Sequence, residues 1–182
     1  MAHIRLRTGM YIGRIGNGSN PDDGIYVLLK EVVDNAIDEF IMGEGRRIEI
    51  SRDGETMTVR DYGRGIPLGK VVDCVSKMHT GGKYNDDVFQ FSVGLNGVGT
   101  KAVNALSEEF EVIAWRSGKA KRATFVRGMK RKVENLKQPA SPDGTFVGFT
   151  PDHEIFGDYE WREEYIEHRL RYYAFLNTGL TL

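Results

Sequence analysis

The feature that most constrains the fold is a series of short alternating segments separated by turn signals. Residues 46–62 read RRIEISRDGETMTVRDY, where two alternating strands flank Asp53-Gly54, a strong signal for a tight hairpin turn. Three more strand candidates follow, FEVIAW (110–115), KRATFVRG (121–128) and TFVGFTP (145–151), and residues 128–144 predict a further short strand and an exposed loop. Consecutive hairpins predict an antiparallel or mixed sheet.

Between these strands the chain has helical patterns. The longest lies within PDDGIYVLLKEVVDNAIDEFIMGEG, residues 21–45, whose apolar residues recur with helical spacing and form a broad stripe. Further helices are predicted at 70–78, at about 99–107 and at 159–177. Helices that cover one face of a mostly antiparallel sheet make a two-layer α/β sandwich, so the predicted fold class is α+β.

The bulk composition narrows the class of protein. The 182 residues are enough for one domain with a core, and 25 Lys+Arg against 26 Asp+Glu argues against a dedicated DNA-binding module. Cys74 is the only cysteine, so no internal disulfide can form and a reducing cytoplasm is expected. No apolar run approaches the roughly 20 residues of a membrane span, and no signal peptide is visible, so a membrane is not an expected partner.

A glycine-rich stretch leads directly into a predicted helix at SVGLNGVGTKAVNAL, residues 92–106. Glycine-rich backbone before a helix N-terminus often holds phosphate. The segment GLNGVGTK nearly matches a P-loop, but its last two residues are Thr100-Lys101 in swapped order and no buried strand precedes it. A dinucleotide fingerprint also fails because no βαβ unit is present. From this stretch alone, a flexible loop with a helix cap stays an open alternative.

Polar residues on the first long helix form a second candidate group. Glu31 and Asn35 are four residues apart and share a helix face, which Asp38 continues. A carboxylate beside a carboxamide oxygen suits a Mg²⁺ nucleotide, and the carboxylate can polarise an attacking water. The alternative is a solvated helix face, for which Asn is a poor choice because its helix propensity is low.

A third candidate group is RDYGRGIP, residues 60–67. Asp61 ends a predicted strand, and two glycines follow it closely. A carboxylate at a strand end beside glycine backbone can accept a hydrogen bond from an exocyclic amine. A simple Asp-Gly turn is the alternative for this segment taken alone.

Together these segments resemble a known family. EVVDNAIDE (31–39), DYGRGIP (61–67) and GLNGVGTKAVNALS (94–107) are similar to the three ATP-binding motifs of the GHKL ATPases. RTGMYIG (7–13) and GGKY (81–84) narrow the resemblance to the B subunits of bacterial type II topoisomerases, DNA gyrase and topoisomerase IV. GTFVGFTPD and FLNTGLTL fit the same family, so the resemblance extends over nearly the whole chain.

The resemblance implies a role for each matching residue. Glu31 would be the general base, and Asn35 the Mg²⁺ ligand. Asp61 would read adenine, with Gly65 and Thr145 sharing a bridging water. The implied contacts of ATP are Asn35, Asp61, Arg64, Gly65, Ile66, Pro67, Lys83, Gly94, Leu95, Asn96, Gly97, Val98, Gly99, Lys101 and Thr145.

Other implied features lie at the rim of that pocket. Arg64 would pair with Glu39 beside the adenine, and Cys74 or Met78 would line the pocket, although a small buried apolar side chain is the simpler reading of Cys74. The sequence departs from the commonest gyrase pattern at Asn96, where that pattern has His, and it adds Lys101. NGVGTK is closer to the loop of eukaryotic topoisomerase II, which makes a phosphate contact by Lys101 plausible. Between the two bacterial enzymes, we favour topoisomerase IV over gyrase.

The resemblance also implies the setting in which the chain acts. Residues 1–182 are expected to be a single ATP-binding domain and a fragment of a longer enzyme, whose ending TGLTL predicts the opening of a strand without a partner. The expected partners are the DNA-cleaving A-type subunit, a second B subunit, duplex DNA and ATP-site inhibitors, with the fragment itself monomeric. Two alternatives are a nucleotide-binding module with negligible turnover and a GHKL kinase domain. The kinase would need a phosphoacceptor histidine in an upstream helical hairpin, which this sequence lacks.

Overall fold

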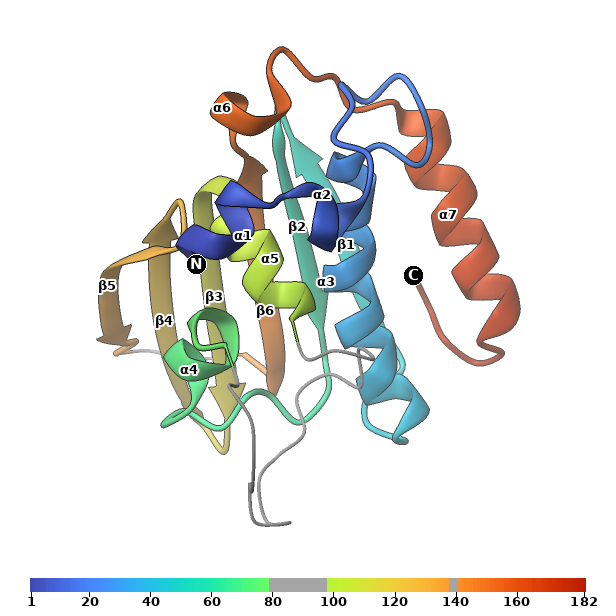
Figure 1. The fold of residues 1–182 in the computed structure, drawn as a ribbon. Coiled ribbons are helices and arrows are strands. Elements are labelled where there is room, and N and C mark those ends of the chain that lie inside the picture. Colours follow the sequence, from blue (N-terminus) through green and yellow to red (C-terminus); the bar gives the residue numbers. More distant parts are fainter. Residues whose placement is uncertain (79–97, 138–140) are drawn as a thin grey trace.

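Six strands form one sheet in a computed structural model of the chain, which describes residues 1–78, 98–137 and 141–182. The strand order is β1-β2-β6-β3-β4-β5, and all neighbouring strands are antiparallel (Figure 1). The strands are β1 (Ile48–Asp53), β2 (Thr56–Asp61), β3 (Ser107–Arg116), β4 (Lys119–Val126), β5 (Met129–Asn135) and β6 (Gly144–Pro151). The predicted hairpins are therefore confirmed. β6 joins the β1–β2 hairpin to the β3–β4–β5 strands, because it pairs with both β2 and β3.

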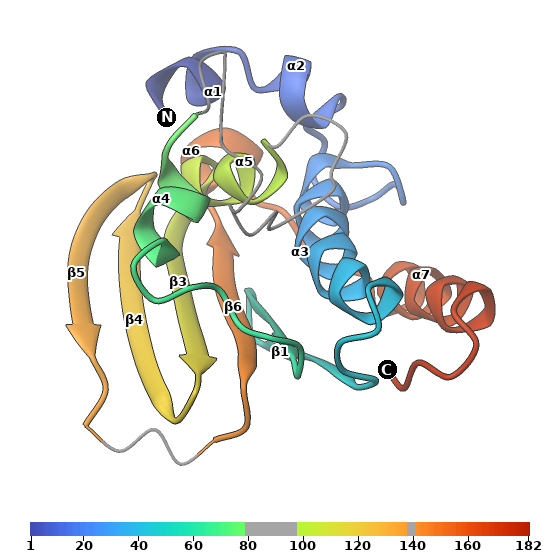
Figure 2. The same ribbon diagram turned by 90° about the horizontal axis from the view of Figure 1, so that it is seen from below.

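Helices cover one face of this sheet. Figures 1 and 2 place α3, α4 and α5 over the same face, with α7 beside α3. The helices are α1 (Ala2–Leu6), α2 (Gly9–Ile12), α3 (Gly24–Ile41), α4 (Val71–Ser76), α5 (Gly99–Ala105), α6 (His153–Phe156) and α7 (Glu163–Leu176). The predicted two-layer α+β class is confirmed. None of the helices in the described ranges is long and apolar enough to cross a bilayer.

The core lies between α3 and the sheet. Leu28, Leu29 and Val32 are buried on α3, and Phe110 and Val112 are buried at alternate positions of β3. Each fully buried apolar side chain of this size contributes about 1.5–3 kcal/mol relative to an exposed one. This packing fixes the face that α3 turns toward β2 and β6, and so it fixes the position of the polar residues on that helix.

The structure corrects several boundaries. The helix predicted at 99–107 ends at Ala105, because Ser107 already belongs to β3. The chain end has a partner, since Thr181 forms a parallel bridge with Arg47 and its carbonyl accepts from the Ile48 N–H at 2.9 Å. The sequence pattern does not predict the helices α1, α2 and α6, because four or five residues are too few for a helical period.

The helix α1 is stabilised by long-range contacts and not by local helix propensity. Arg5 donates to the Ala105 carbonyl at 2.9 Å, which is the end of α5, and pairs with the buried Asp152 at 2.7 Å. Asp152 also caps α6 by accepting from the Glu154 N–H at 3.0 Å. A single arginine therefore ties α1 to two other helices, which a local reading of the sequence does not reveal.

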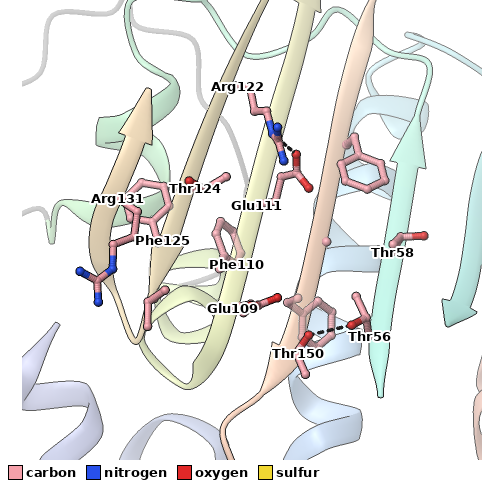
Figure 3. Close-up of a pocket in the computed structure, with 14 residues that line it drawn as sticks. Thr56, Thr58, Glu109, Phe110, Glu111, Arg122, Thr124, Phe125, Arg131 and Thr150 are labelled. Atoms are coloured by element: carbon pink, nitrogen blue, oxygen red, sulfur yellow. Dashed lines mark hydrogen bonds and ion pairs between the residues drawn. The ribbon is translucent and has the colours of Figure 1, made fainter. Parts of the chain in front are cut away.

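The opposite face of the sheet is open and carries a groove of about 310 Å³ (Figure 3). Threonines of β2 and β6 line one end of it, where Thr56 and Thr150 share a hydrogen bond of 2.8 Å. Glu111 of β3 and Arg122 of β4 form an ion pair across it. The groove is therefore lined by aromatic as well as polar side chains, and it carries charges of both signs.

Candidate functional site

The residues of the second and third candidate groups meet between α3, β2 and β6. A small pocket of about 10 Å³ lies there, which is room for about one water molecule. Its walls are mostly apolar, and its polar groups are Asn35, Asp61 and Thr145. The lining residues are Val32, Asn35, Ala36, Val59, Asp61, Thr145 and Val147. Polar groups that converge within apolar walls can fix the orientation of a ligand, and this space itself has the size of one bridging water.

Asp61 is the charged group of this pocket, at the end of β2 and only 6% exposed. Its Oδ1 accepts from the Gly63 N–H at 2.9 Å and from the Thr145 N–H at 3.2 Å. Burial raises the pKa of Asp61 to about 6, although the two backbone hydrogen bonds and Arg60 oppose the rise. Both hydrogen bonds end on Oδ1, so Oδ2 can accept a hydrogen bond from a ligand.

The raised pKa predicts a stability cost for the ionised carboxyl. Asp61→Asn is expected to increase the free energy of unfolding at pH 7.5 by on the order of 1–3 kcal/mol. A carboxyl whose folded pKa is raised binds its proton more tightly when folded, so wild type gains stability as pH falls through about 6. Urea unfolding at pH 7.5 and pH 5 should therefore show the advantage of the variant shrinking at the lower pH. A less stable variant at pH 7.5 would show that the backbone hydrogen bonds outweigh the burial of charge.

Two glycines after Asp61 allow the chain to turn closely around the pocket. Gly65 has φ +73°, and a Cβ there would stand 2.1 Å from the Trp115 carbonyl oxygen. Arg116 donates to the Gly65 carbonyl at 2.8 Å, which ties this turn to the end of β3. Glycine is therefore required at position 65, because the backbone there is left-handed and because another backbone segment approaches closely.

The ion pair predicted between Arg64 and Glu39 is formed. Glu39 is 3% exposed, and its Oε1 lies 2.8 Å from Arg64 Nη2. Its Oε2 accepts from the backbone N–H and the Nε of the same arginine, at 2.9 and 3.2 Å. These contacts join the end of α3 to the turn after β2, and the hydrogen bonds with Glu39 raise the pKa of Arg64.

Glu31 and Asn35 lie where α3 meets the start of α5. A Cβ on Gly99 would stand 2.2 Å from Glu31 Oε2, so a larger residue there would displace that carboxylate. Asn35 is buried, and its Nδ2 donates to the Thr100 hydroxyl. The hydrogen bond on Nδ2 turns the carboxamide oxygen of Asn35 away from Thr100. Carboxamide oxygen is a ligand type that Mg²⁺ accepts, so the residues present fit a magnesium ion that is also held by a ligand's oxygens.

Two charged residues of α3, Lys30 and Asp34, act on Glu31. Burial raises the pKa of Glu31, Lys30 lowers it and Asp34 raises it. Lys30 Nζ lies 2.5 Å from Asp34 Oδ2 but 3.9 Å from Glu31 Oε1. The other oxygen of Asp34 accepts a hydrogen bond from Tyr173 of α7. Asp34 therefore holds the ammonium of Lys30, which leaves Glu31 without a close cationic partner among the described residues.

The remaining predicted contacts have mixed placements. Ile66 is fully buried in the core and Pro67 is half-buried, and neither lines the small pocket. Lys101 is 5% exposed, and burial lowers its pKa while Cys74 raises it. Val98 is half-buried before α5. Lys83, Gly94, Leu95, Asn96 and Gly97 lie outside the described residues.

Sequence patterns assign no role to Thr100, Lys30 or Tyr173. Thr100 stands next to Lys101 in the glycine-rich motif, but nothing in the motif shows that its hydroxyl contacts Asn35, 65 residues earlier. Lys30 is four residues before Asp34, and this spacing is a readable signal for an ion pair on a helix. Tyr173 has no such signal, because its contact depends on how α7 packs on α3.

Comparisons with known proteins agree with this geometry. The family model described as histidine kinase-, DNA gyrase B-, and HSP90-like ATPase matches residues 20–153. The B subunit of DNA topoisomerase 4 from Borreliella burgdorferi is 58% identical over 182 residues, 100% of this chain and 30% of that protein. The B subunit of DNA gyrase from Rickettsia conorii is 38% identical over 190 residues, 98% of this chain and 23% of that protein. The chain therefore spans less than a third of the length of these two curated relatives.

A solved structure also has the same fold. It is the crystal structure of the 43K ATPase domain of Thermus thermophilus gyrase B in complex with an aminocoumarin, with a TM-score of 0.81 and 33% sequence identity. The match covers 98% of this chain and 46% of that one. The arrangement of strands and helices described above is thus similar to that of this ATPase domain.

Proposed function

The chain belongs to the family of histidine kinase-, DNA gyrase B-, and HSP90-like ATPases, and we propose that it binds and hydrolyses ATP for a bacterial type II topoisomerase. Identity of 58% to the B subunit of a topoisomerase 4, against 38% to the B subunit of a gyrase, favours topoisomerase IV. The observation that carries the proposal is the buried Asp61 carboxylate, held at the pocket by two backbone N–H groups. Residues 1–182 would act as one domain of that enzyme.

Asp61 would recognise adenine. The exocyclic amine of the base donates, and a carboxylate accepts only, so the two match across the pocket. Thr145 and Gly65 lie beside Asp61, and the space of about 10 Å³ is enough for the one water that they would share with the base. Arg64, held by Glu39, would cover the edge of the base at the rim.

Asn35 would hold magnesium through its carboxamide oxygen, because Thr100 engages its Nδ2. Magnesium bound with the triphosphate would neutralise charge that develops on the phosphates. Glu31, next to Gly99, would accept a proton from the attacking water, and burial raises its pKa toward the value that a base needs at neutral pH. The glycine-rich loop, Lys83 and Lys101 would contact the phosphates.

In the full enzyme, ATP binding would close a dimeric gate through which a DNA duplex passes. The proposed partners are the A-type subunit, a second B subunit and duplex DNA, in the cytoplasm, with small molecules that compete at the ATP site as inhibitors. The chain alone would be monomeric. A nucleotide-binding module with negligible turnover is the alternative, and comparing phosphate release by this chain and by a full-length subunit distinguishes the two.

The magnesium assignment predicts a graded loss of affinity. Asn35→Ala is expected to remove most of the magnesium-dependent part of ATP affinity, because it removes the oxygen ligand. Thr100→Val should produce a smaller loss in the same direction, since it frees the carboxamide to rotate without removing it. Calorimetric titration of ATP with Mg²⁺ and with EDTA measures both effects, and Ser51→Ala on the exposed β1 strand is a control. Equal dependence on Mg²⁺ in wild type and Asn35→Ala would contradict the assignment.

A further inference from the structure

The basic residues of this chain are unevenly distributed. Eight of its 25 Lys+Arg residues lie between 116 and 132, where there is no Asp or Glu, leaving 17 against 26 acidic residues elsewhere. We call residues 116–132, which contain β4, the β4–β5 turn and the start of β5, the basic hairpin. The remainder of the chain is therefore clearly acidic, although the total charge is only −1. Such an asymmetry orients a protein toward a polyanion.

The basic hairpin occupies an edge of the sheet. β5 is the last strand in the order β1-β2-β6-β3-β4-β5, and in Figure 1 it lies at the end of the sheet away from α7. Lys119, Lys130, Arg131 and Lys132 are exposed, and Lys121 is half-buried. The charges are therefore on an accessible edge, and of these residues Arg131 also lines the groove of the open face, whose Glu111 and Arg122 neutralise each other (Figure 3).

Only some of these charges are neutralised within the protein. Lys132 lies 2.7 Å from Glu134, and Arg127 lies 2.6 Å from Glu154 and 3.0 Å from the buried Asp152. By contrast, no ion pair within the described part of the chain involves the other exposed or half-buried cations of the edge. These are Lys119, Lys121, Lys130 and Arg131.

The four cations follow the two strands. Lys121 lies opposite Asn135 at one end of the β4–β5 pair, and Lys130 lies opposite Phe125 near the other. Arg131 is the extra residue at the register shift between Thr124 and Phe125, and its side chain points away from the strands in Figure 3. A seven-residue strand is roughly 23 Å long. Over that length duplex DNA presents about one negative charge per 1.7 Å of helix axis.

We propose that the basic hairpin binds the phosphate backbone of duplex DNA. This inference rests on the proposed function, whose substrate is duplex DNA, and it assigns part of that substrate's contact to the ATP-binding domain. Lysines on an edge strand also prevent edge-to-edge pairing, but that purpose does not account for Lys119, which begins β4 beside the β3–β4 turn. The edge presents no aromatic side chain for stacking, because β5 contains none, so a single strand is the less suitable ligand.

The test removes the four unneutralised charges together. The variant Lys119→Gln, Lys121→Gln, Lys130→Gln, Arg131→Gln is compared with wild type for affinity to a fluorescent duplex across a series of NaCl concentrations. Because each phosphate contact contributes about 0.9 to the salt slope, the slope should fall by up to about 3.6, and affinity at low salt by at least about tenfold. The matched control removes four positive charges from the opposite side of the molecule, on β1 and its flank and on α7 and its N-cap. It carries Arg46→Gln, Arg52→Gln, Arg162→Gln and Arg171→Gln, and should keep wild-type affinity and slope.

Several results would overturn the inference. They are an unchanged slope in the hairpin variant, an equal loss in the control, tighter binding of single strands than of duplex, or no duplex binding by wild type. ATP affinity is measured on the same samples. Because none of the four substituted residues is a proposed contact of ATP, the variant should bind ATP as wild type does. Any of these four results, obtained while wild type still binds ATP, would overturn only this inference, whereas failure of wild type to bind ATP would overturn the proposed function.

Discussion

Replacing Glu31 with glutamine is expected to lower ATP turnover by about 10²–10⁴-fold while ATP affinity changes little. Glutamine keeps the shape that packs against Gly99, where a Cβ would stand 2.2 Å from the Glu31 oxygen. It cannot accept a proton from water, however, and burial has raised the pKa of this carboxyl in the wild type. A less acidic carboxyl is the stronger base, so the same burial that costs stability favours proton transfer.

A matched control for this substitution is Asp34→Asn, which makes the same chemical change three residues along α3. Asp34 holds Lys30 at 2.5 Å and accepts from Tyr173, so its loss frees the ammonium to approach Glu31. We expect a loss of turnover much smaller than that of Glu31→Gln, with Lys30→Met restoring part of it. Phosphate release under saturating ATP measures all three variants. Wild-type turnover by Glu31→Gln would show that another group is the base.

Much of the fold was predictable because it depends on local signals. The β1–β2 hairpin follows from alternation on either side of Asp53-Gly54, and α3 follows from an apolar stripe that recurs over 18 residues. The short helix α1 was not predictable, because Arg5 stabilises it through contacts 100 and 147 residues away in the sequence. The pairing of Thr181 with the flank of β1 is equally non-local.

The candidate site was predictable at the level of residue types and motifs. Asp61 and Thr145 do come together, and the Arg64–Glu39 ion pair is formed as predicted. What the sequence could not reveal is which side chains fix others in place. The Thr100 hydroxyl on Asn35 and the Tyr173 hydroxyl on Asp34 are examples. Such contacts depend on how α5 and α7 pack against α3, and periodicity carries no information about that packing.

The second large effect concerns the choice of base. ATP is expected to bind and GTP to be rejected, by up to about 10⁴-fold. The adenine amine would donate to the Asp61 carboxylate, whereas guanine would place a carbonyl oxygen at the equivalent edge. Two acceptors would then face each other in a pocket where Asp61 is only 6% exposed, and a buried polar group without a partner is heavily penalised.

Asp61→Asn should weaken this discrimination, because it should improve the binding of GTP and weaken the binding of ATP. The carboxamide supplies an N–H donor from which the guanine oxygen can accept a hydrogen bond. The hydrogen bond between the carboxamide and adenine is neutral and not charge-assisted. ATP affinity should therefore fall and the ratio between ATP and GTP should shrink, although the same variant is expected to be more stable at pH 7.5. Asn135→Asp on the exposed edge strand is a control, because it exchanges a carboxamide for a carboxylate away from the pocket. The ratio of its ATP affinity to its GTP affinity should equal that of wild type.

Calorimetric titration of the wild-type chain with ATP and with GTP, in Mg²⁺ at pH 7.5, tests the central claim most directly. The proposed role of Asp61 predicts a saturable exothermic isotherm for ATP and little or no heat for GTP at the same concentrations. It also predicts that ATP affinity declines below pH 6, because protonation of Asp61, whose pKa is about 6, replaces the charged acceptor with a neutral and weaker one. Equal affinity for the two nucleotides would contradict adenine recognition by Asp61, and with it the assignment of this pocket.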